Sequence, residues 1–467
     1  MTLHRLMRRT ALAAGLLGVF VSALAGCGGG SGVSSVNGGG NNGGSNGGTG
    51  TGPGLSDPPD TNRAACAANA HVNGRAKWTV LVYINAANNL QPDSLLNVAQ
   101  MASVGSDSNV NIVIQWKQAQ CVDCGQPSFF ATRRYLLHQH PAADVTAIGN
   151  GNTTSLDADR LADPTTNDSA THQSDMGSYL TLQNFVRWGA QNYPADHLAV
   201  VVWDHGSGWR NVFRTATKTK ITPRFRAVSQ DNQSNNEIET WELPTALTGT
   251  AQPIDCLVFD CSLEMMAEVA YEVRSTAKVM VGSEESPPGA GYAYDSWLTA
   301  LKTTGTDPCN VSNSILTTFI AAYPDATDIT QSVVDLSKMQ AVASSLDAFG
   351  NSLLAHASDQ AAVIANARNN AQSYAYPENK DLYHYADLIR TTTPAADLQQ
   401  AAFNMEAALR GAGKAVIFQG HGNTAQANSY GMAIYVPEPG NYLSTYNNLA
   451  LTHTAPHWAQ FLQAQKQ

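Results

Sequence analysis

A histidine and a cysteine at the ends of two apolar segments are the residues of this 467-residue chain best suited to chemistry. His205 follows the apolar run 197–203, and Cys261 follows the apolar run 253–259. An imidazole can take the proton of a thiol, and the thiolate that results is a strong nucleophile. The pair therefore predicts nucleophilic catalysis.

The elements that must position this pair can be read from the sequence around it. Both apolar runs are short and indicate strands that are buried on both faces of a sheet. In an open α/β sheet, sites form at the edge where parallel strands end. An amphipathic helix is expected at 180–194, and the glycines at 206 and 208 allow the backbone after His205 to approach a substrate closely.

Strands and helices alternate along most of the chain, which favours a mainly parallel sheet with helices on both faces. After residue 305 the pattern becomes mainly helical, so a helical C-terminal part is expected to elaborate this α/β fold. The expected strands, besides the two above, are 77–84, 109–116, 133–139, 278–283, 415–420 and 431–437. The expected helices are 90–104, 180–194, 238–250, 264–275, 313–323, 341–357 and 397–412.

Five motifs resemble, in order, those of the clostripain family of cysteine peptidases, and the resemblance covers nearly all of 76–467. They are KWTVLVYINAANNL at 77–90, DHGSGW at 204–209, FDCSLEMMAEVAYE at 259–272, VGSEESPPGAGYAY at 281–294 and GMAIYVP at 431–437. The resemblance implies a caspase-like fold, with His205 as the catalytic base and the backbone near Gly206 stabilising the oxyanion.

The nucleophile motif departs from the family pattern. The family reads Phe-Asp-Ala-Cys, whereas an ungapped match places Cys261 on the alanine and Ser262 on the cysteine. Adjacent side chains of an extended segment point to opposite faces, so the displaced thiol should point away from His205 unless the turn is rebuilt. Three alternatives follow: Cys261 is the nucleophile after a local shift, Ser262 is the nucleophile, or the chain is an inactive surface binding protein.

The same resemblance implies a substrate class. Asp260 matches the family aspartate that lines the pocket for a basic side chain, and a carboxylate forms charge-assisted hydrogen bonds with Lys or Arg. A cysteine-type endopeptidase that cleaves peptides after Arg or Lys is therefore expected. The chemistry requires no cofactor and no metal, and the resemblance allows a structural calcium ion. It also implies activation by cleavage between the catalytic residues, where 210–226 is rich in Lys and Arg.

The N-terminal region carries export signals. Residues 1–26 combine arginines with a short apolar stretch and resemble a lipoprotein signal peptide, which would be cut before Cys27. Acylation of Cys27 would anchor the protein to a membrane by lipid, with 27–72 as a flexible Gly-, Ser- and Asn-rich tether and 73–467 as the α/β domain. The chain is thus expected to be an exported bacterial lipoprotein of the outer membrane or cell surface.

Charge and cysteine content agree with an exported protein. The formal net charge is −10 and no basic arm is present, which argues against nucleic acid as a partner. Outside the cytoplasm thiols tend to pair, so Cys121 and Cys124 are expected to form a local disulfide. If Cys261 is catalytic, an odd number of other cysteines remains after Cys27 and one of them is left over.

Overall fold

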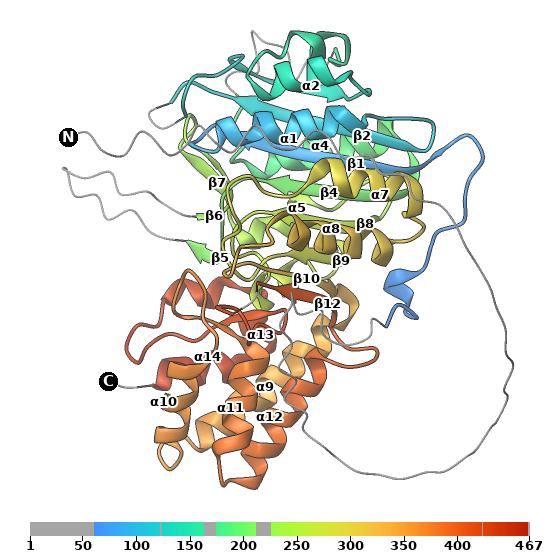
Figure 1. Ribbon diagram of the computed structural model, residues 1–467. Coiled ribbons are helices and arrows are strands. Elements are labelled where there is room, and N and C mark those ends of the chain that lie inside the picture. Colours follow the sequence, from blue (N-terminus) through green and yellow to red (C-terminus); the bar gives the residue numbers. More distant parts are fainter. Residues whose placement is uncertain (1–59, 122–123, 163–173, 212–225, 423, 466–467) are drawn as a thin grey trace, which may run out of the picture. The chain divides into compact units, whose positions relative to one another are not determined.

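The computed structural model describes residues 60–121, 124–162, 174–211, 226–422 and 424–465 (Figure 1). Cys27, the expected signal peptide and most of the basic segment 210–226 lie outside these residues. In the part of the chain that is described, no helix has the length and apolar character needed to cross a membrane.

The core of the fold is an eight-stranded sheet with the order β12-β10-β9-β8-β4-β1-β2-β3 (Figure 1). The strands from β9 to β2 are parallel to one another, and antiparallel pairs lie towards both edges. This confirms the expected mainly parallel sheet. The strands are β1 (Ala76–Ala86), β2 (Val110–Gln118), β3 (Ala131–Leu136), β4 (Ala195–Trp203), β8 (Ile254–Asp260), β9 (Ala277–Gly282), β10 (Thr330–Asp335) and β12 (Val416–His421).

Helices cover both faces of this sheet, because the side chains of its central strands alternate between two apolar cores. Leu257 and Phe259 of β8 belong to one core, whereas Cys256 and Val258 belong to the other. The first core includes α4 (Tyr179–Asn192), α5 (Leu243–Ala246), α6 (Ala267–Glu272) and α9 (Met339–Ala355). The second includes α1 (Gln91–Val104), α2 (Ala142–Gly149), α7 (Tyr294–Thr304) and α8 (Pro308–Ala322).

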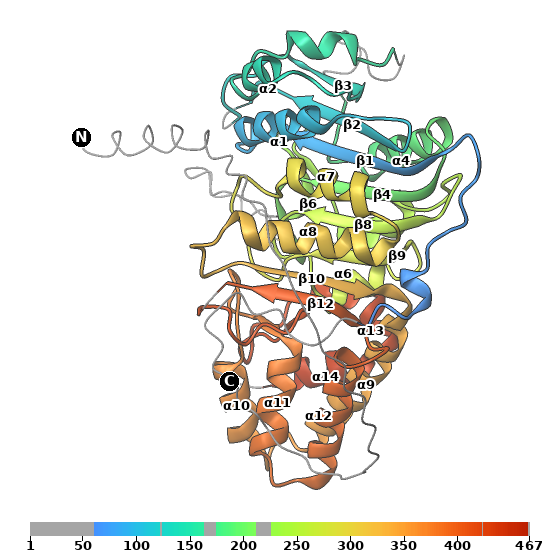
Figure 2. The ribbon, with the colours of Figure 1, turned by 45° about the vertical axis from the view of Figure 1, so that its right-hand side comes forward.

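The C-terminal part is mainly helical, as expected, and its helices share the first core (Figure 2). A short sheet of β11 (Asn379–Asp381) and β13 (Ala433–Tyr435) joins it to the segment after β8, since the Ala433 N–H donates to the Met265 carbonyl over 3.0 Å. The additional helices are α10 (Ala361–Asn370), α11 (Leu382–Thr392), α12 (Ala396–Leu409), α13 (Ala450–Thr454) and α14 (Pro456–Ala464).

The helices α2, α7, α10, α11, α13 and α14 were not among the expected elements, and two further regions also differ from the sequence expectation. The segment 238–250 is not one helix, because Ile238 ends strand β7 (Asn236–Ile238) and only α5 is helical beyond a short 3-10 turn. This strand belongs to a small sheet with β5 (Gly206–Asn211) and β6 (Arg226–Asp231). Strand β10 was not expected, because its sequence TQSVVD has few apolar residues and lies between two helical segments.

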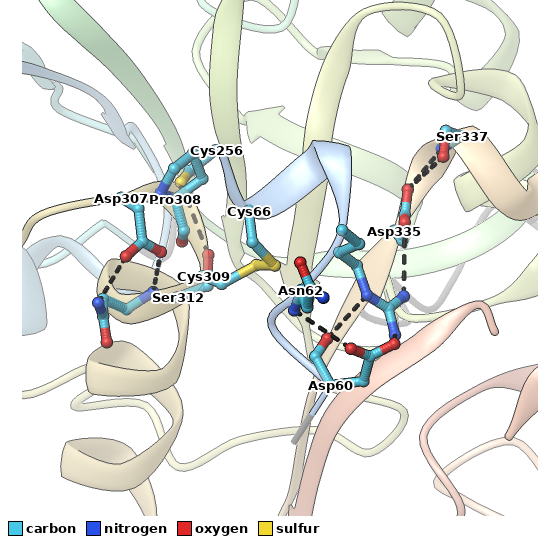
Figure 3. Close-up of a disulfide and its surroundings, with 12 residues drawn as sticks. Asp60, Asn62, Cys66, Cys256, Asp307, Pro308, Cys309, Ser312, Asp335 and Ser337 are labelled. Atoms are coloured by element: carbon cyan, nitrogen blue, oxygen red, sulfur yellow. Dashed lines mark hydrogen bonds and ion pairs between the residues drawn. A yellow bond between two sulfur atoms is a disulfide. The ribbon is translucent and has the colours of Figure 1, made fainter. Parts of the chain in front are cut away.

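The residues just before the domain are held against it (Figure 3). Cys66 forms a disulfide with Cys309 on α8, and the Arg63 guanidinium lies 3.4 Å from the Asp335 carboxylate. Residues 60–72, the described part of the segment expected as a tether, therefore contact the domain. The expected disulfide between Cys121 and Cys124 is confirmed.

Candidate active site

His205 directly follows the last residues of β4 and is held by polar contacts from the loop after β1. The Asp204 carboxylate accepts hydrogen bonds from the His205 backbone N–H over 2.6 Å and from the Asn88 amide over 2.6 Å. The His205 Nε2 atom lies 2.8 Å from the Asn89 Oδ1 atom. Burial lowers the pKa of His205 to about 4, so the imidazole is neutral at pH 7 and can accept a proton.

The ends of β4 and β8 lie side by side. Trp203 pairs with Asp260 in the parallel ladder, and the Asp204 backbone N–H donates to the Asp260 carbonyl over 3.3 Å. This register brings His205 to the same edge of the sheet as Cys261 and Ser262. The expectation that both motifs emerge at neighbouring strand ends agrees with this pairing.

The thiol of Cys261 points into the first core. It continues the alternation of Leu257 and Phe259, its side chain is 1% exposed, and its Sγ atom lies 3.2 Å from the Val202 carbonyl oxygen. Burial, reinforced by the nearby Glu264 and other carboxyl groups, raises the pKa of the Cys261 thiol well above its usual range. In this arrangement Cys261 is a neutral, buried thiol.

Ser262 occupies a different environment from its neighbour. Its side chain is half-buried, and its Oγ atom lies 2.8 Å from the Oγ atom of Ser286. The next residue, Leu263, has a φ angle of 66°, a left-handed conformation that a leucine rarely adopts. The turn that follows β8 thus separates the two adjacent side chains, with the thiol in the core and the hydroxyl towards the surface.

Asp260 lies at the bottom of the site. It is 5% exposed and accepts hydrogen bonds from the Tyr294 hydroxyl over 2.9 Å and from the Tyr292 backbone N–H over 3.3 Å. Burial raises the pKa of Asp260 to about 7. Gly291 has a φ angle of 63°, and a Cβ atom there would lie 2.8 Å from an Asp260 oxygen, so only glycine leaves the carboxylate its space.

These side chains share one cavity of about 340 Å³. All five residues expected to form the site line it, and segments 286–291 and 375–376 form further parts of its wall. Those five residues are His205, Gly206, Asp260, Cys261 and Ser262. A cavity that combines a neutral imidazole, a hydroxyl and a buried carboxyl can bind a peptide and act on its carbonyl group.

Gly206 brings the two strand ends into close contact. A Cβ atom at this position would meet the Ser262 carbonyl oxygen and would lie 3.0 Å from the Cβ atom of Cys261. In the two residues that follow Gly206, the backbone N–H groups of Ser207 and Gly208 donate hydrogen bonds to the Glu264 carboxyl over 3.2 Å and 3.1 Å. The loop after His205 is therefore fixed to the loop after β8.

Asn89 and Glu264 were not among the residues expected in the site. The position of Asn89 after the first strand of a parallel sheet is a signal, because that strand ends at the same edge as β4. Glu264 is a charged residue inside an apolar stretch, which indicates a buried partner for backbone amides. Glu284 and Glu285, in contrast, bond to the Tyr374 hydroxyl and the Ala375 N–H, so both acids hold the wall of the cavity.

The sequence also offers His421, which precedes a glycine after an apolar run, as a rival base, and the resemblance allows a calcium ion. His421 ends β12, an edge strand of the sheet, and it is not among the residues that line the cavity described above. For calcium, the described residues contain no group of three or more acidic, His or Cys side chains that could hold an ion. The structural calcium ion that the resemblance allows stays a prediction.

Comparisons with known proteins identify the family. The model of the clostripain family matches residues 82–464. Clostripain of Hathewaya histolytica is 25% identical over 316 residues, which cover 60% of this chain and 57% of that protein. This chain therefore matches little more than half the length of that relative.

Solved structures agree on the fold. A secreted C11 cysteine protease from Bacteroides thetaiotaomicron, bound to an irreversible peptide inhibitor, superposes with a TM-score of 0.56 at 16% identity, covering 83% of this chain and 99% of the other. An inactive zymogen C11 protease from Parabacteroides distasonis gives 0.56 at 19% identity, with coverage of 82% and 99%. With the family model matching most of the described domain, the chain belongs to the clostripain family.

Proposed function

We propose that this chain is an endopeptidase of the cell envelope that cleaves after Arg or Lys, with His205 as the general base. The observation that carries this proposal is the shared cavity, in which the imidazole and the buried Asp260 carboxyl lie beside the two candidate nucleophiles. Asp260 offers a charge-assisted hydrogen bond to a basic side chain at the bottom of the cavity. The backbone N–H of Gly206 is the proposed donor to the oxyanion, because the N–H groups of Ser207 and Gly208 already donate to Glu264.

The nucleophile that the described geometry supports is Ser262. Ser262 lines the cavity, and its hydroxyl bonds to that of Ser286, another residue of the cavity wall. In the proposed reaction a neutral His205 takes the proton of the Ser262 hydroxyl as the oxygen attacks the peptide carbonyl. The acyl-enzyme that forms is released by water. Cys261 is the second candidate, and its use requires the turn 261–263 to rotate the thiol away from the Val202 carbonyl.

A peptide-binding protein without hydrolytic activity is the second function that a specific observation favours. The only thiol beside the cavity among the described residues is buried in the core and held in its neutral form. A serine hydroxyl needs much stronger activation than a thiol. Loss of hydrolysis would leave a cavity that binds peptides through the Asp260 carboxyl.

The location at the envelope is part of the same proposal. The lipoprotein-like sequence before Cys27 supports a lipid anchor, and a structural neighbour from Bacteroides thetaiotaomicron is described as secreted. Disulfides persist in oxidising compartments, and the described chain contains two of them, Cys66–Cys309 and Cys121–Cys124.

The proposal is tested with the full-length protein in detergent. Fluorogenic peptides that differ only in having Arg, Lys or norleucine before the reporter are incubated with wild-type protein and His205→Ala. We expect hydrolysis after Arg and Lys, little after norleucine, and none above background in the variant. Equal cleavage after norleucine contradicts the assigned specificity, and hydrolysis that survives in His205→Ala contradicts the assigned base. Tight binding of the Arg peptide without hydrolysis supports the binding protein instead.

A further inference from the structure

A second cavity of about 450 Å³ lies beside the proposed active site. Its walls come from three parts of the chain: Arg210 on β5, the segment 377–378 before β11, and the segment 435–443 that begins at the end of β13. None of these residues takes part in the reaction proposed above. The second cavity therefore needs its own explanation.

The two cavities are continuous along two chain segments. Strand β5 begins at Gly206 in the first cavity and reaches Arg210 in the second, and the loop before β11 passes from Tyr376 in the first to Glu378 in the second. The Arg210 guanidinium lies 4.9 Å from the centre of the Tyr376 ring, so these two side chains form the ridge between the cavities. An extended peptide advances about 3.3 Å per residue and can cross this ridge within a few residues.

The floor of the second cavity is rigid. Tyr435 is fully buried, and its ring lies 4.8 Å from that of Trp209 and 5.0 Å from that of Tyr446. The Tyr435 hydroxyl donates to the Asn441 carbonyl over 3.0 Å and accepts from the Leu443 N–H over 3.2 Å. These bonds fix the loop 436–443 around its ring, so the cavity is formed before a ligand arrives.

Among the charged side chains that line this cavity, an acidic one can pair with a ligand. Arg210 is paired with Glu378, which leaves neither group free for a ligand. Glu438 is exposed and forms no ion pair with the described residues. Lys380 lies within electrostatic range of Glu438, but its side chain is 7% exposed and it does not line the cavity.

We propose that the second cavity is a specificity subsite that receives a basic side chain of the peptide, a few residues away from the bond that is cut. The aliphatic stem of Lys or Arg would pack on Tyr442 and Leu443, and its charged end would pair with Glu438. Aromatic rings next to a carboxylate suit this ligand, because both attract a cation. This inference rests on the proposed function, in which the first cavity holds the residue before the cut.

The test uses peptides with one fixed Arg and a second variable residue placed two to five positions away on either side. The variable residue is Lys, Ala or Glu, and mass spectrometry counts only the product of cleavage after the fixed Arg. At one position we expect kcat/KM to be about tenfold higher for Lys than for Glu, with Ala between them. A ratio near one at every position overturns the proposal.

A charge reversal sharpens the test. In Glu438→Lys the preference at that position should invert, so that the Glu peptide becomes the better substrate. The matched control is Asp359→Lys, because Asp359 is exposed, lies between α9 and α10 and lines neither cavity. This control should keep the wild-type ratio. An unchanged ratio in Glu438→Lys, or the same inversion in Asp359→Lys, overturns the assignment to Glu438.

Binding separates this proposal from the proposed function. If no peptide is cut, fluorescence anisotropy of the labelled Lys and Glu peptides still reports the subsite, and their dissociation constants should differ in the same direction and invert in Glu438→Lys. If the Lys and Glu peptides bind with different affinities but neither is cut, the result supports the subsite and excludes the peptidase proposal. If peptides are cut after Arg but the Lys and Glu peptides do not differ, the result supports the peptidase and excludes the subsite.

Discussion

The ends of β4 and β8 meet at one cavity, but they expose their reactive side chains in opposite ways. After β4, the imidazole of His205 faces the cavity and is contacted by an exposed asparagine. After β8, the strand alternation continues for one more residue and carries the Cys261 thiol into the core, while Ser262 is presented in its place. The alternation of side chains along β8 therefore decides that the Ser262 hydroxyl, and not the more reactive Cys261 thiol, is available to a substrate.

The largest effect is expected from variants at the end of β8. Ser262→Ala should lower kcat/KM by on the order of 10³-fold or more, because it removes the hydroxyl that the turn presents. Cys261→Ala should retain hydrolysis and lower only the stability, since it deletes a buried side chain. Ser262→Cys should be faster than the wild type. Steady-state kinetics with an Arg substrate checks all three variants. If Cys261→Ala is inactive and Ser262→Ala keeps wild-type activity, Cys261 is the nucleophile instead of Ser262.

A variant of Asp260 tests whether the cavity at the two strand ends recognises the positive charge of a substrate side chain. Asp260→Asn removes one charge-assisted pair, which is worth about 1.5–3 kcal/mol, and should lower kcat/KM for Arg and Lys substrates by about 10–150-fold. Cleavage after norleucine should change far less. A similar loss for both substrates would mean that the variant disturbs the fold around Tyr292 and Tyr294 instead of removing recognition.

The pH dependence of kcat/KM distinguishes the titration of the Asp260 carboxyl from that of the His205 imidazole. Asp260 has a pKa raised to about 7, and a cationic side chain needs its ionised form. For an Arg substrate, kcat/KM should therefore fall about tenfold between pH 8 and pH 6 as the carboxyl takes up a proton. His205, with a pKa lowered to about 4, stays neutral over this range, so a norleucine substrate should show no such fall. Parallel profiles for both substrates would exclude Asp260 as their cause.

The smallest effect is expected from the asparagine at the end of β1. Asn89→Asp places a negative charge 2.8 Å from the His205 ring, which favours the imidazolium and raises its pKa. The acidic limb of the pH profile should move upwards, with a few-fold loss of kcat/KM at pH 5. Asn89→Ala should leave that limb in place and is the control. The same shift in both variants would show that Asn89 acts only through packing.

Much of the fold could be predicted because its central strands are continuous apolar runs, and the alternation of strands with helices indicates a mainly parallel sheet. Strand β10 could not, since TQSVVD reads as an edge or a loop and becomes a strand only by pairing with β9 and β12. Ile238 likewise becomes part of a strand only through its antiparallel pairing with Val228. Pairing between distant segments leaves little trace in a local pattern.

For the site, the motifs at the strand ends identified His205, Asp260 and the alternative between Cys261 and Ser262. Asn89 and Glu264 were missed, because a polar residue in a loop or a helix shows its partner only when the chain is folded. The two hydrogen bonds that Glu264 accepts from residues 207 and 208 join segments more than fifty positions apart. No spacing rule in the sequence connects them.

The disulfide between Cys66 and Cys309 has a mechanical consequence. It joins residues separated by 243 positions, and the Arg63 contact with Asp335 acts beside it. Any pulling force that enters from the N-terminal side at residue 60 is therefore passed to α8 and β10 before it reaches β1 at Ala76. Strand β1, in the middle of the sheet, is shielded from being peeled away, and the strand ends that form the cavity keep their alignment under tension.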